Sequence, residues 1–385
     1  MHPFLTPSHE KFRLRVREFA TREIKEIARK LDDTSTFSPE LTRKMGQFGL
    51  FGMNLPEKYG GTNMDTLSYI IAVEELARID SSQAATVASH NSLGISPIYQ
   101  FGTDKQKEEL LPGFCTGDRL WAFGLTEETA GSDARGTKTE AILNDGQWVI
   151  SGSKMFITNS ASVLSYGATI QVVTSKSNGD IELSAILVPR DTPGYRSKKI
   201  SNKMMWRAAD TGMLYFENCR VPEQNLLGKR GMGARIMLQT LDSGRLSIAA
   251  MGLGLAQGAF ELALEYAKTR VQFGRPIAQF QSIAFKLADM DMKLELARNT
   301  LYKACKMKDD QLPFGREAAI AKLYCSEIAR EVADEAVQIH GAYGLFKDSD
   351  IERFYRDQRI LQIGEGTSEI LRVVISRYLG LKHIS

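Results

Sequence analysis

Apolar residues recur at intervals of three and four along the first third of the chain, and this period predicts α-helices. The runs are 12–31, 38–50 and 65–78, and residues that favour a helix start stand at the beginning of the first two. Residues 81–100 are small and apolar, interrupted only by uncharged polar residues and His90. This last run suits either a buried helix that lines a pocket or an ordinary core helix.

The period changes at about residue 119. Polar and apolar residues alternate from 137 to 142, and the Asn-Asp-Gly sequence at 144–146 is typical of a hairpin turn. The short apolar runs that follow, bounded by Gly, Asn and Asp, are 148–150, 169–173, 183–188 and 213–216. We therefore expect a small antiparallel β-domain over 119–225.

Helical period returns after this domain and holds to the end of the chain. The runs are 246–270, 281–308, 314–341 and 367–378. Long helices of this kind favour an antiparallel four-helix bundle. The order of helices, strands and helices predicts an α+β fold. Its expected parts are an N-terminal helical domain (1–118), the middle β-domain (119–225) and a C-terminal four-helix bundle (226–385).

Composition narrows the possible partners. The 385 residues are enough for two or three domains, and 43% hydrophobic and 25% charged residues are usual for a globular protein. The net charge of +3 is small, so we expect neither a nucleic-acid partner nor a membrane-surface partner. No apolar run approaches the roughly 20 residues of a membrane span. The N-terminus resembles neither a signal nor a transit peptide, which predicts a cytoplasmic protein.

The cysteines and histidines indicate no metal site. The four cysteines are scattered, without a CxxC motif or a Cys/His spacing typical of metal ligands. The histidines form no metal-binding pair either. We therefore expect buried or free thiols in a reducing compartment and no disulfide or metal centre.

A short stretch near the C-terminus places one carboxylate, Glu365, between Gly364 and Gly366. A helix that begins at Thr367 or Ser368 leaves Glu365 just before its first turn, where backbone N–H groups are unpaired. The glycines let backbone and ligand approach closely. A carboxylate beside such a site can remove a proton alpha to a carbonyl. An ordinary exposed loop is the alternative, and this stretch taken alone favours the loop.

Five short motifs, each of low specificity when taken alone, follow one another along the chain. They are residues 123–133 (FGLTEETAGSD), 156–159 (FITN), 270–281 (RVQFGRPI followed by Gln281), 338–344 (QIHGAYG) and 365–370 (EGTSEI). Their order and spacing resemble those of the acyl-CoA dehydrogenases, and the resemblance covers essentially the whole chain.

The resemblance implies a flavoenzyme with FAD bound between the β-domain and the helical bundle, usually as a homotetramer. Such enzymes oxidise the Cα–Cβ bond of an acyl-CoA thioester to a trans-enoyl-CoA and pass electrons to an electron-transferring flavoprotein. Glu365 matches the most common catalytic base, and its backbone N–H with a ribityl hydroxyl would bind the thioester oxygen. FAD N5 would take the Cβ hydride. Burial against the ligand is expected to raise the pKa of Glu365.

The resemblance also assigns the binding residues. The positions that match FAD contacts, partly across a subunit interface, are Phe123, Leu125, Thr126, Ser132, Phe156, Thr158, Arg270, Gln272, Phe273, Gln281, Gln338, Gly341, Thr367 and Glu369. The positions that match substrate contacts are Ser132, Asp242, Arg245 and Gly366. The alternative for Asp242 and Arg245 is an ion pair on a helix surface.

Three features of the sequence bear on the base and the substrate. Gly244 stands where isovaleryl-CoA dehydrogenases carry their base, which leaves Glu365 as the only candidate. Gly364 replaces a tyrosine that is common in straight-chain members, which predicts a short branched, alicyclic or otherwise bulky acyl group. Residues 81–100 contain no Arg or Lys, which argues against the carboxylate recognition of glutaryl-CoA dehydrogenases.

Two other functions agree less well with the sequence. A flavin-dependent oxidase or oxygenase on the same fold would use oxygen as acceptor. Retention of Glu365 together with Asp242 and Arg245 favours acyl-CoA dehydrogenation over that alternative. A non-catalytic or nucleic-acid-binding relative would have lost the base and gained a strongly basic patch, and the sequence shows neither change.

Overall fold

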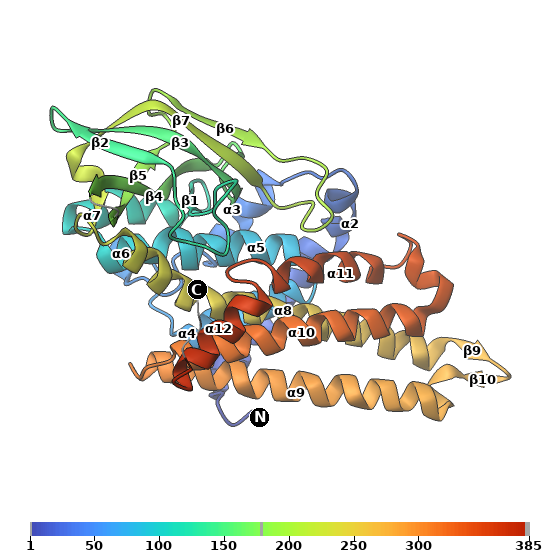
Figure 1. Cartoon of the computed structure of the whole chain (residues 1–385). Coiled ribbons are helices and arrows are strands. Elements are labelled where there is room, and N and C mark those ends of the chain that lie inside the picture. The colour runs from blue at the N-terminus through green and yellow to red at the C-terminus, as the bar shows by residue number, and fades with distance from the viewer. Residues whose placement is uncertain (1, 178–179, 382–385) are drawn as a thin grey trace.

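Helices occupy both ends of the chain and a β-sheet lies between them, as the order of periods predicted (Figure 1). The computed structural model describes residues 2–177 and 180–381. Figure 1 shows the sheet above α5 (Ser81–Ser89) and α6 (Ser96–Phe101), with the C-terminal helices on the other side of these two. The fold therefore has the α+β class expected from the sequence.

The N-terminal helices contain irregular turns that the apolar period did not predict. The first, α1 (Pro7–Phe19), starts at a capping box formed by Thr6 and His9. It continues through a π-helical turn, Ala20–Ile24, into α2 (Lys25–Asp33). The remaining segments are α3 (Pro39–Gln47), a short 3₁₀ turn (Glu57–Tyr59), α4 (Thr66–Ala77), α5, a π-helical turn η3 (His90–Ile95), α6 and α7 (Asp104–Phe114).

The middle of the chain forms one eight-stranded sheet. Its strands are β1 (Leu120–Gly124), β2 (Glu140–Asn144), β3 (Gln147–Thr158), β4 (Ser165–Ser177), β5 (Asp180–Pro189), β6 (Tyr195–Lys199), β7 (Thr211–Pro222) and β8 (Leu226–Leu227). Their order is β6-β7-β3-β2-β4-β5-β8, with β1 paired to β4. Most pairs are antiparallel, including the predicted β2–β3 hairpin. The β1–β4 pair is parallel, because the connection between these strands is long enough to return to the same end of the sheet.

The C-terminal part consists mainly of long helices. The long helices are α8 (Gly233–Thr269), α9 (Gln281–Asp309) and α10 (Gly315–His340). The short α11 (Ile351–Asp357), a 3₁₀ turn η7 (Gln358–Gln362) and α12 (Ser368–Tyr378) follow them. The hairpin of β9 (Val271–Gln272) and β10 (Arg275–Pro276) joins α8 to α9 and projects from one end of the molecule (Figure 1). α8 begins well before the predicted start at 246, because charged residues interrupt its apolar pattern there.

α8 lies in the centre of the helical core. A Cβ at Gly254 would lie 2.1 Å from the Glu74 carbonyl oxygen of α4, so glycine permits this close approach. Among the described residues, α8 is the one helix long and apolar enough to cross a membrane. The expectation that no apolar run approaches that length was therefore wrong. Because 83% of its apolar window is buried inside the protein, core packing accounts for this composition.

The cysteines agree with the sequence prediction. All four are free and buried. Among the residues that the structure describes, no group of three or more His, Cys, Asp or Glu side chains is placed to hold a metal ion.

Candidate active site

The backbone around Glu365 turns sharply before α12. Thr367 caps the helix by accepting a hydrogen bond from Ile370 N at 3.2 Å, so α12 starts where the sequence predicted. Glu365 has a φ of +53° and Gly366 a φ of +104°. A left-handed backbone is uncommon for a residue with a side chain and often marks a functional site. The turn directs the Glu365 carboxylate toward α8.

The Glu365 carboxylate lies against the position of Gly244 on α8. A Cβ at Gly244 would lie 2.0 Å from Glu365 Oε2 and 3.1 Å from Leu93 Cδ2. Glu365 as a whole is partly exposed, but its Oε2 oxygen is buried and has no hydrogen-bond partner. The absence of a side chain at Gly244 therefore makes the space that this carboxylate occupies.

Burial and two cations set the charge state of Glu365. Burial raises the pKa of Glu365 from 4.5 to about 7, and the positive charges of Lys322 and Arg245 oppose this rise. The rise expected from the sequence is therefore present. A carboxylate with a pKa near neutrality can both accept a proton and release it again.

Asp242 and Arg245 form an ion pair, but not on an exposed surface. They are one turn apart on α8, and the Arg245 side chain is 7% exposed whereas that of Asp242 is 38% exposed. Burial raises the pKa of Asp242, and the Arg245 charge opposes this. Arg245 Nε is buried without a partner. The pair thus lies at the edge of the Glu365 site with hydrogen-bonding capacity left for a ligand.

The β-domain presents several of the predicted FAD positions beside one another. Met155 N donates to Thr126 O at 2.9 Å, which brings the loop after β1 next to Phe156 on β3. Phe156 is 62% exposed and has a φ of +60°. An exposed ring on a left-handed backbone offers an apolar face to a planar ligand. These residues, with Thr158 two positions on, fit a flavin ring that needs an apolar cover and polar partners at its edge.

The other predicted positions on the β-domain differ in exposure. Phe123 is buried in a core cluster, and Leu125 packs against that cluster. Ser132 is exposed on the long loop that joins β1 to β2. Within this group the Ser132 side chain is therefore open to solvent, whereas that of Phe123 is not.

A buried ion pair that sequence reasoning missed holds this loop. Lys154 Nζ donates to Glu127 Oε1 at 2.7 Å and to Leu125 O at 3.2 Å. Glu127 also accepts hydrogen bonds from the backbone N–H groups of Lys138 and Thr139. Burial lowers the pKa of Lys154 to about 8. The pair anchors the segment that carries Thr126, and the presence of Glu127 within the motif was the available signal.

The remaining predicted FAD positions lie at the far end of the helical bundle. They are Arg270, Gln272, Phe273, Gln281, Gln338 and Gly341. Arg270 lies over the Tyr343 ring at 5.4 Å, and Phe273 is 92% exposed at the tip of the hairpin. α9 starts at this end and, with 29 residues, extends for about 44 Å. One chain therefore does not bring this group to Glu365 (Figure 1).

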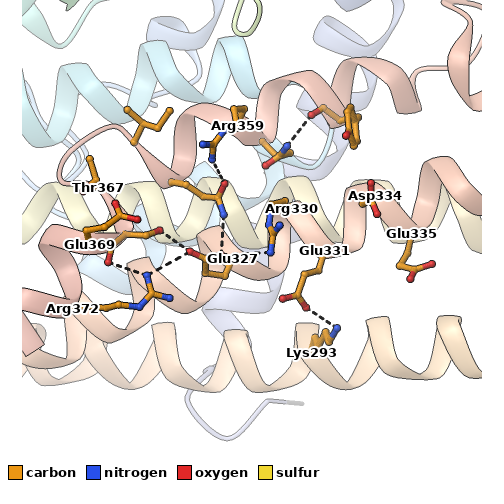
Figure 2. Close-up of a pocket in the computed structure, with 15 residues that line it drawn as sticks. Lys293, Glu327, Arg330, Glu331, Asp334, Glu335, Arg359, Thr367, Glu369 and Arg372 are labelled. Atoms are coloured by element: carbon orange, nitrogen blue, oxygen red, sulfur yellow. Dashed lines mark hydrogen bonds and ion pairs between the residues drawn. The ribbon is translucent and has the colours of Figure 1, made fainter.

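Thr367 and Glu369, the last two predicted FAD positions, border a strongly polar cavity of about 970 Å³ (Figure 2). Charged side chains of both signs line it, and they come from α9, α10, α12 and the 3₁₀ turn before Glu365. Glu327 of α10 joins the 3₁₀ turn to α12 by accepting hydrogen bonds from Gln362 and Ser368. Glu365 is not among the lining residues. The segment that carries the base thus has Glu365 on one side and this cavity on another.

A smaller cavity of about 170 Å³ lies beside the helix formed by residues 81–100. Its lining includes Tyr69, Asn91, Ser243 and Lys308. Burial lowers the pKa of the Lys308 amine. Sequence reasoning sought a cation only within 81–100 and missed Lys308 on α9. The absence of Arg and Lys from that helix is therefore no measure of the charge in the cavity it lines.

Models of one protein family match nearly the whole chain. The acyl-CoA dehydrogenase N-terminal domain matches residues 6–118, the middle domain 122–219 and the C-terminal domain 231–380.

Individual relatives agree with these matches. A probable acyl-CoA dehydrogenase of Bacillus subtilis is 46% identical over 97% of this chain and 98% of its own length. The structure of butyryl-CoA dehydrogenase from Megasphaera elsdenii has a TM-score of 0.95 and 41% identity, covering 99% of this chain and 100% of its own. A structure described as the electron transferring flavoprotein of Acidaminococcus fermentans contains a chain with a TM-score of 0.95 and 41% identity, and the match covers 98% of this chain and 99% of that one.

Proposed function

This chain belongs to the acyl-CoA dehydrogenase family, and we propose that Glu365 is the base that removes the Cα proton of a short acyl-CoA thioester. The chain is an FAD-dependent dehydrogenase, as family membership establishes. The environment of the Glu365 carboxylate supports the assignment of this residue as the base. Its Oε2 oxygen is buried without a partner, and its pKa is raised to about 7.

The residues around Glu365 supply what proton removal requires. The Cα–H of a saturated thioester is weakly acidic, so the site must polarise the carbonyl and place a base beside it. Among the described residues, the Glu365 N–H donates to no backbone or side-chain acceptor, which leaves it available to the thioester oxygen. We infer that Asp242 and Arg245, which form an ion pair near Glu365, bind the CoA portion and that Gly366 lets the ligand approach the backbone.

The reaction leaves a double bond between Cα and Cβ. The Cα proton goes to the Glu365 carboxylate, and its bonding electrons form the new π bond. FAD, when bound, supplies the acceptor for the hydride that leaves Cβ. Thr126, Phe156 and Thr158 would hold the flavin ring, and an electron-transferring flavoprotein would reoxidise it.

The substrate we propose has a short acyl group that is branched or alicyclic. The relative named butyryl-CoA dehydrogenase supports the short length. Gly364 supports the shape, because the atoms nearest to a Cβ there would be those of Ile360 at 3.5–3.8 Å, which is ordinary contact. Neither packing nor a left-handed backbone requires glycine at this position. The missing side chain is therefore better explained by space for the ligand.

A panel of acyl-CoAs tests both the reaction and this preference. Under anaerobic conditions, we expect short branched or alicyclic thioesters to bleach the flavin faster than palmitoyl-CoA. Gly364→Tyr should slow the bulky substrates more than butyryl-CoA, because the ring fills the added space. Faster bleaching by palmitoyl-CoA would refute the proposed shape. Reoxidation by electron-transferring flavoprotein but not by air is expected, whereas rapid reoxidation by air indicates the oxidase alternative.

A homotetramer would bring the two groups of FAD positions together. In one chain, Arg270, Gln272 and Phe273 lie on or beside the projecting hairpin, far from the β-domain (Figure 1). A second copy could supply them to the adenosine and pyrophosphate end of FAD, and arginine binds pyrophosphate well. We expect light scattering to give four times the mass of one chain at micromolar concentration. A monomeric holoenzyme with full activity contradicts the proposal.

A further inference from the structure

One face of α10 holds the segment that carries Glu365. Lys322 Nζ donates to the Gly366 carbonyl oxygen at 2.6 Å, and Ser326 Oγ donates to the Leu361 carbonyl oxygen at 2.9 Å. Lys322 and Ser326 are four residues apart, so they lie on the same face of the helix. Both side chains thus hold carbonyl groups on either side of the base.

Lys322 is unusual because its charge lies in the protein interior. The residue is 0% exposed, and lysine is almost never fully buried unless a partner compensates its charge. Ser326 shows that a neutral hydroxyl is enough to hold a backbone carbonyl of this segment. A carbonyl bond alone therefore does not explain why an ammonium stands at position 322.

The charged groups around Lys322 come from three elements besides its own. They are Glu365 from the base segment, Arg245 from α8, Glu327 from α10 and Glu369 from α12. Glu365 in turn interacts electrostatically with Lys322 and Arg245, and the charge of Glu365 also acts on the Tyr69 hydroxyl of α4. Arg245 is paired with Asp242, which offsets much of its positive charge at the base. Glu327 and Glu369 also act on Lys322, but among the described residues Lys322 forms no ion pair, whereas Arg245 does.

We propose that Lys322 is a positioning residue for proton abstraction, which fixes the Gly366 carbonyl and places a positive charge near the Glu365 carboxylate. This inference rests on the proposed function of Glu365. The hydrogen bond to Gly366 restrains the residue that follows the base, and so helps to hold the left-handed backbone of Glu365. The charge favours the ionised form that accepts the Cα proton.

The two ionisation equilibria leave a window in which both groups are charged. Burial raises the pKa of Glu365 to about 7, and the positive charge of Lys322 limits this rise more than that of Arg245 does. Burial lowers the pKa of Lys322 to about 8, with Glu365 acting against it. The base is therefore ionised above about pH 7, while Lys322 still carries its proton up to about pH 8. A neutral residue at 322 must move the ionisation of Glu365 to higher pH.

Single-turnover reduction of the flavin by butyryl-CoA, measured from pH 5.5 to 9, tests this role. In the holoenzyme of Lys322→Met, we expect the midpoint of the acid limb to rise by about one pH unit, which lowers the rate about fivefold at pH 7. Lys322→Gln keeps a hydrogen-bond donor without the charge and should show the same shift, so it replaces Lys322→Met if that variant does not fold. Lys322→Arg should retain the wild-type midpoint.

Ser326→Ala is the matched control, because it removes a carbonyl bond on the same face without a charge and should leave the midpoint unchanged. An infrared titration of the carboxyl band that Glu365→Gln removes should show the same shift independently of turnover. A wild-type midpoint in both neutral variants would overturn the role of Lys322. Absence of bleaching in the wild-type protein with every acyl-CoA would instead overturn the proposed function, and this inference with it.

Discussion

Replacing Glu365 by glutamine is expected to lower the rate of flavin reduction by butyryl-CoA by about 10³–10⁴-fold. Glutamine has nearly the same shape and keeps hydrogen-bonding capacity, but it does not accept the Cα proton at neutral pH. The measurement is anaerobic single-turnover bleaching in the FAD-loaded variant. Acyl-CoA binding, followed by the spectral shift of the oxidised flavin, should change by less than about tenfold. A near-normal bleaching rate would show that another group is the base.

The same variant has a second expected effect, on stability. The folded-state pKa of Glu365 is raised from 4.5 to about 7, so ionisation of this carboxyl opposes folding. While the carboxyl is protonated it does not oppose folding, so its contribution to the free energy of unfolding is fully present below about pH 4.5. This contribution is lost as pH rises through about 7. Glu365→Gln removes that loss, up to about 3 kcal/mol at pH 8. Its Tm should therefore exceed that of the wild type at pH 8 and equal it at pH 4.5.

Gly244→Ala is expected to reduce the rate of flavin reduction by about 10²-fold with little effect on stability. The new Cβ would lie 2.0 Å from Glu365 Oε2, which is the far end of a flexible side chain. The carboxylate can move away at small cost in folding free energy. A displacement of about 1 Å is enough to lose roughly 10²-fold in rate, because the base then misses the Cα proton. Single-turnover kinetics and thermal unfolding measure the two effects.

Gly252→Ala is the control for a methyl group added to the same helix. Its Cβ would meet the Cys325 carbonyl oxygen of α10 at 2.7 Å, and a backbone atom gives way less readily than a side chain. This variant should lose stability but keep its rate per folded holoenzyme. If Gly244→Ala shows that same pattern, Gly244 serves helix packing and not the placement of the base.

Local sequence patterns predicted the features that local forces determine. The helical periods of α9 and α10 and the start of α12 at Ser368 were visible because an apolar face, or a capping residue such as Thr367, lies within a few residues. The first turns of α8 were missed, because Asp242 and Arg245 interrupt the apolar pattern there. The parallel pairing of β1 with β4 joins distant segments and leaves no local period.

The site was predictable by residue type but not by geometry. The sequence suggested Glu365 as the base and showed that Gly244 leaves no competing base at its own position. It did not show that the Glu365 carboxylate occupies the space that a side chain at position 244 would fill. Lys322 was missed because a lysine on a helix is usually in solvent. A signal was present, since position 322 lies one turn from the buried Ala318 and Cys325 on the same helical face.

Exchange of the Cα hydrogen with solvent tests most directly whether Glu365 carries the proton. Butyryl-CoA is incubated anaerobically in D₂O with the FAD-loaded wild type or with Glu365→Gln, and the recovered thioester is examined by mass spectrometry. We predict that the wild type introduces deuterium at Cα, because each proton taken by Glu365 can exchange before the reverse step. We predict no incorporation by Glu365→Gln in the time the wild type needs for completion. Incorporation at a rate within tenfold of the wild type would contradict the assignment of Glu365 as the base.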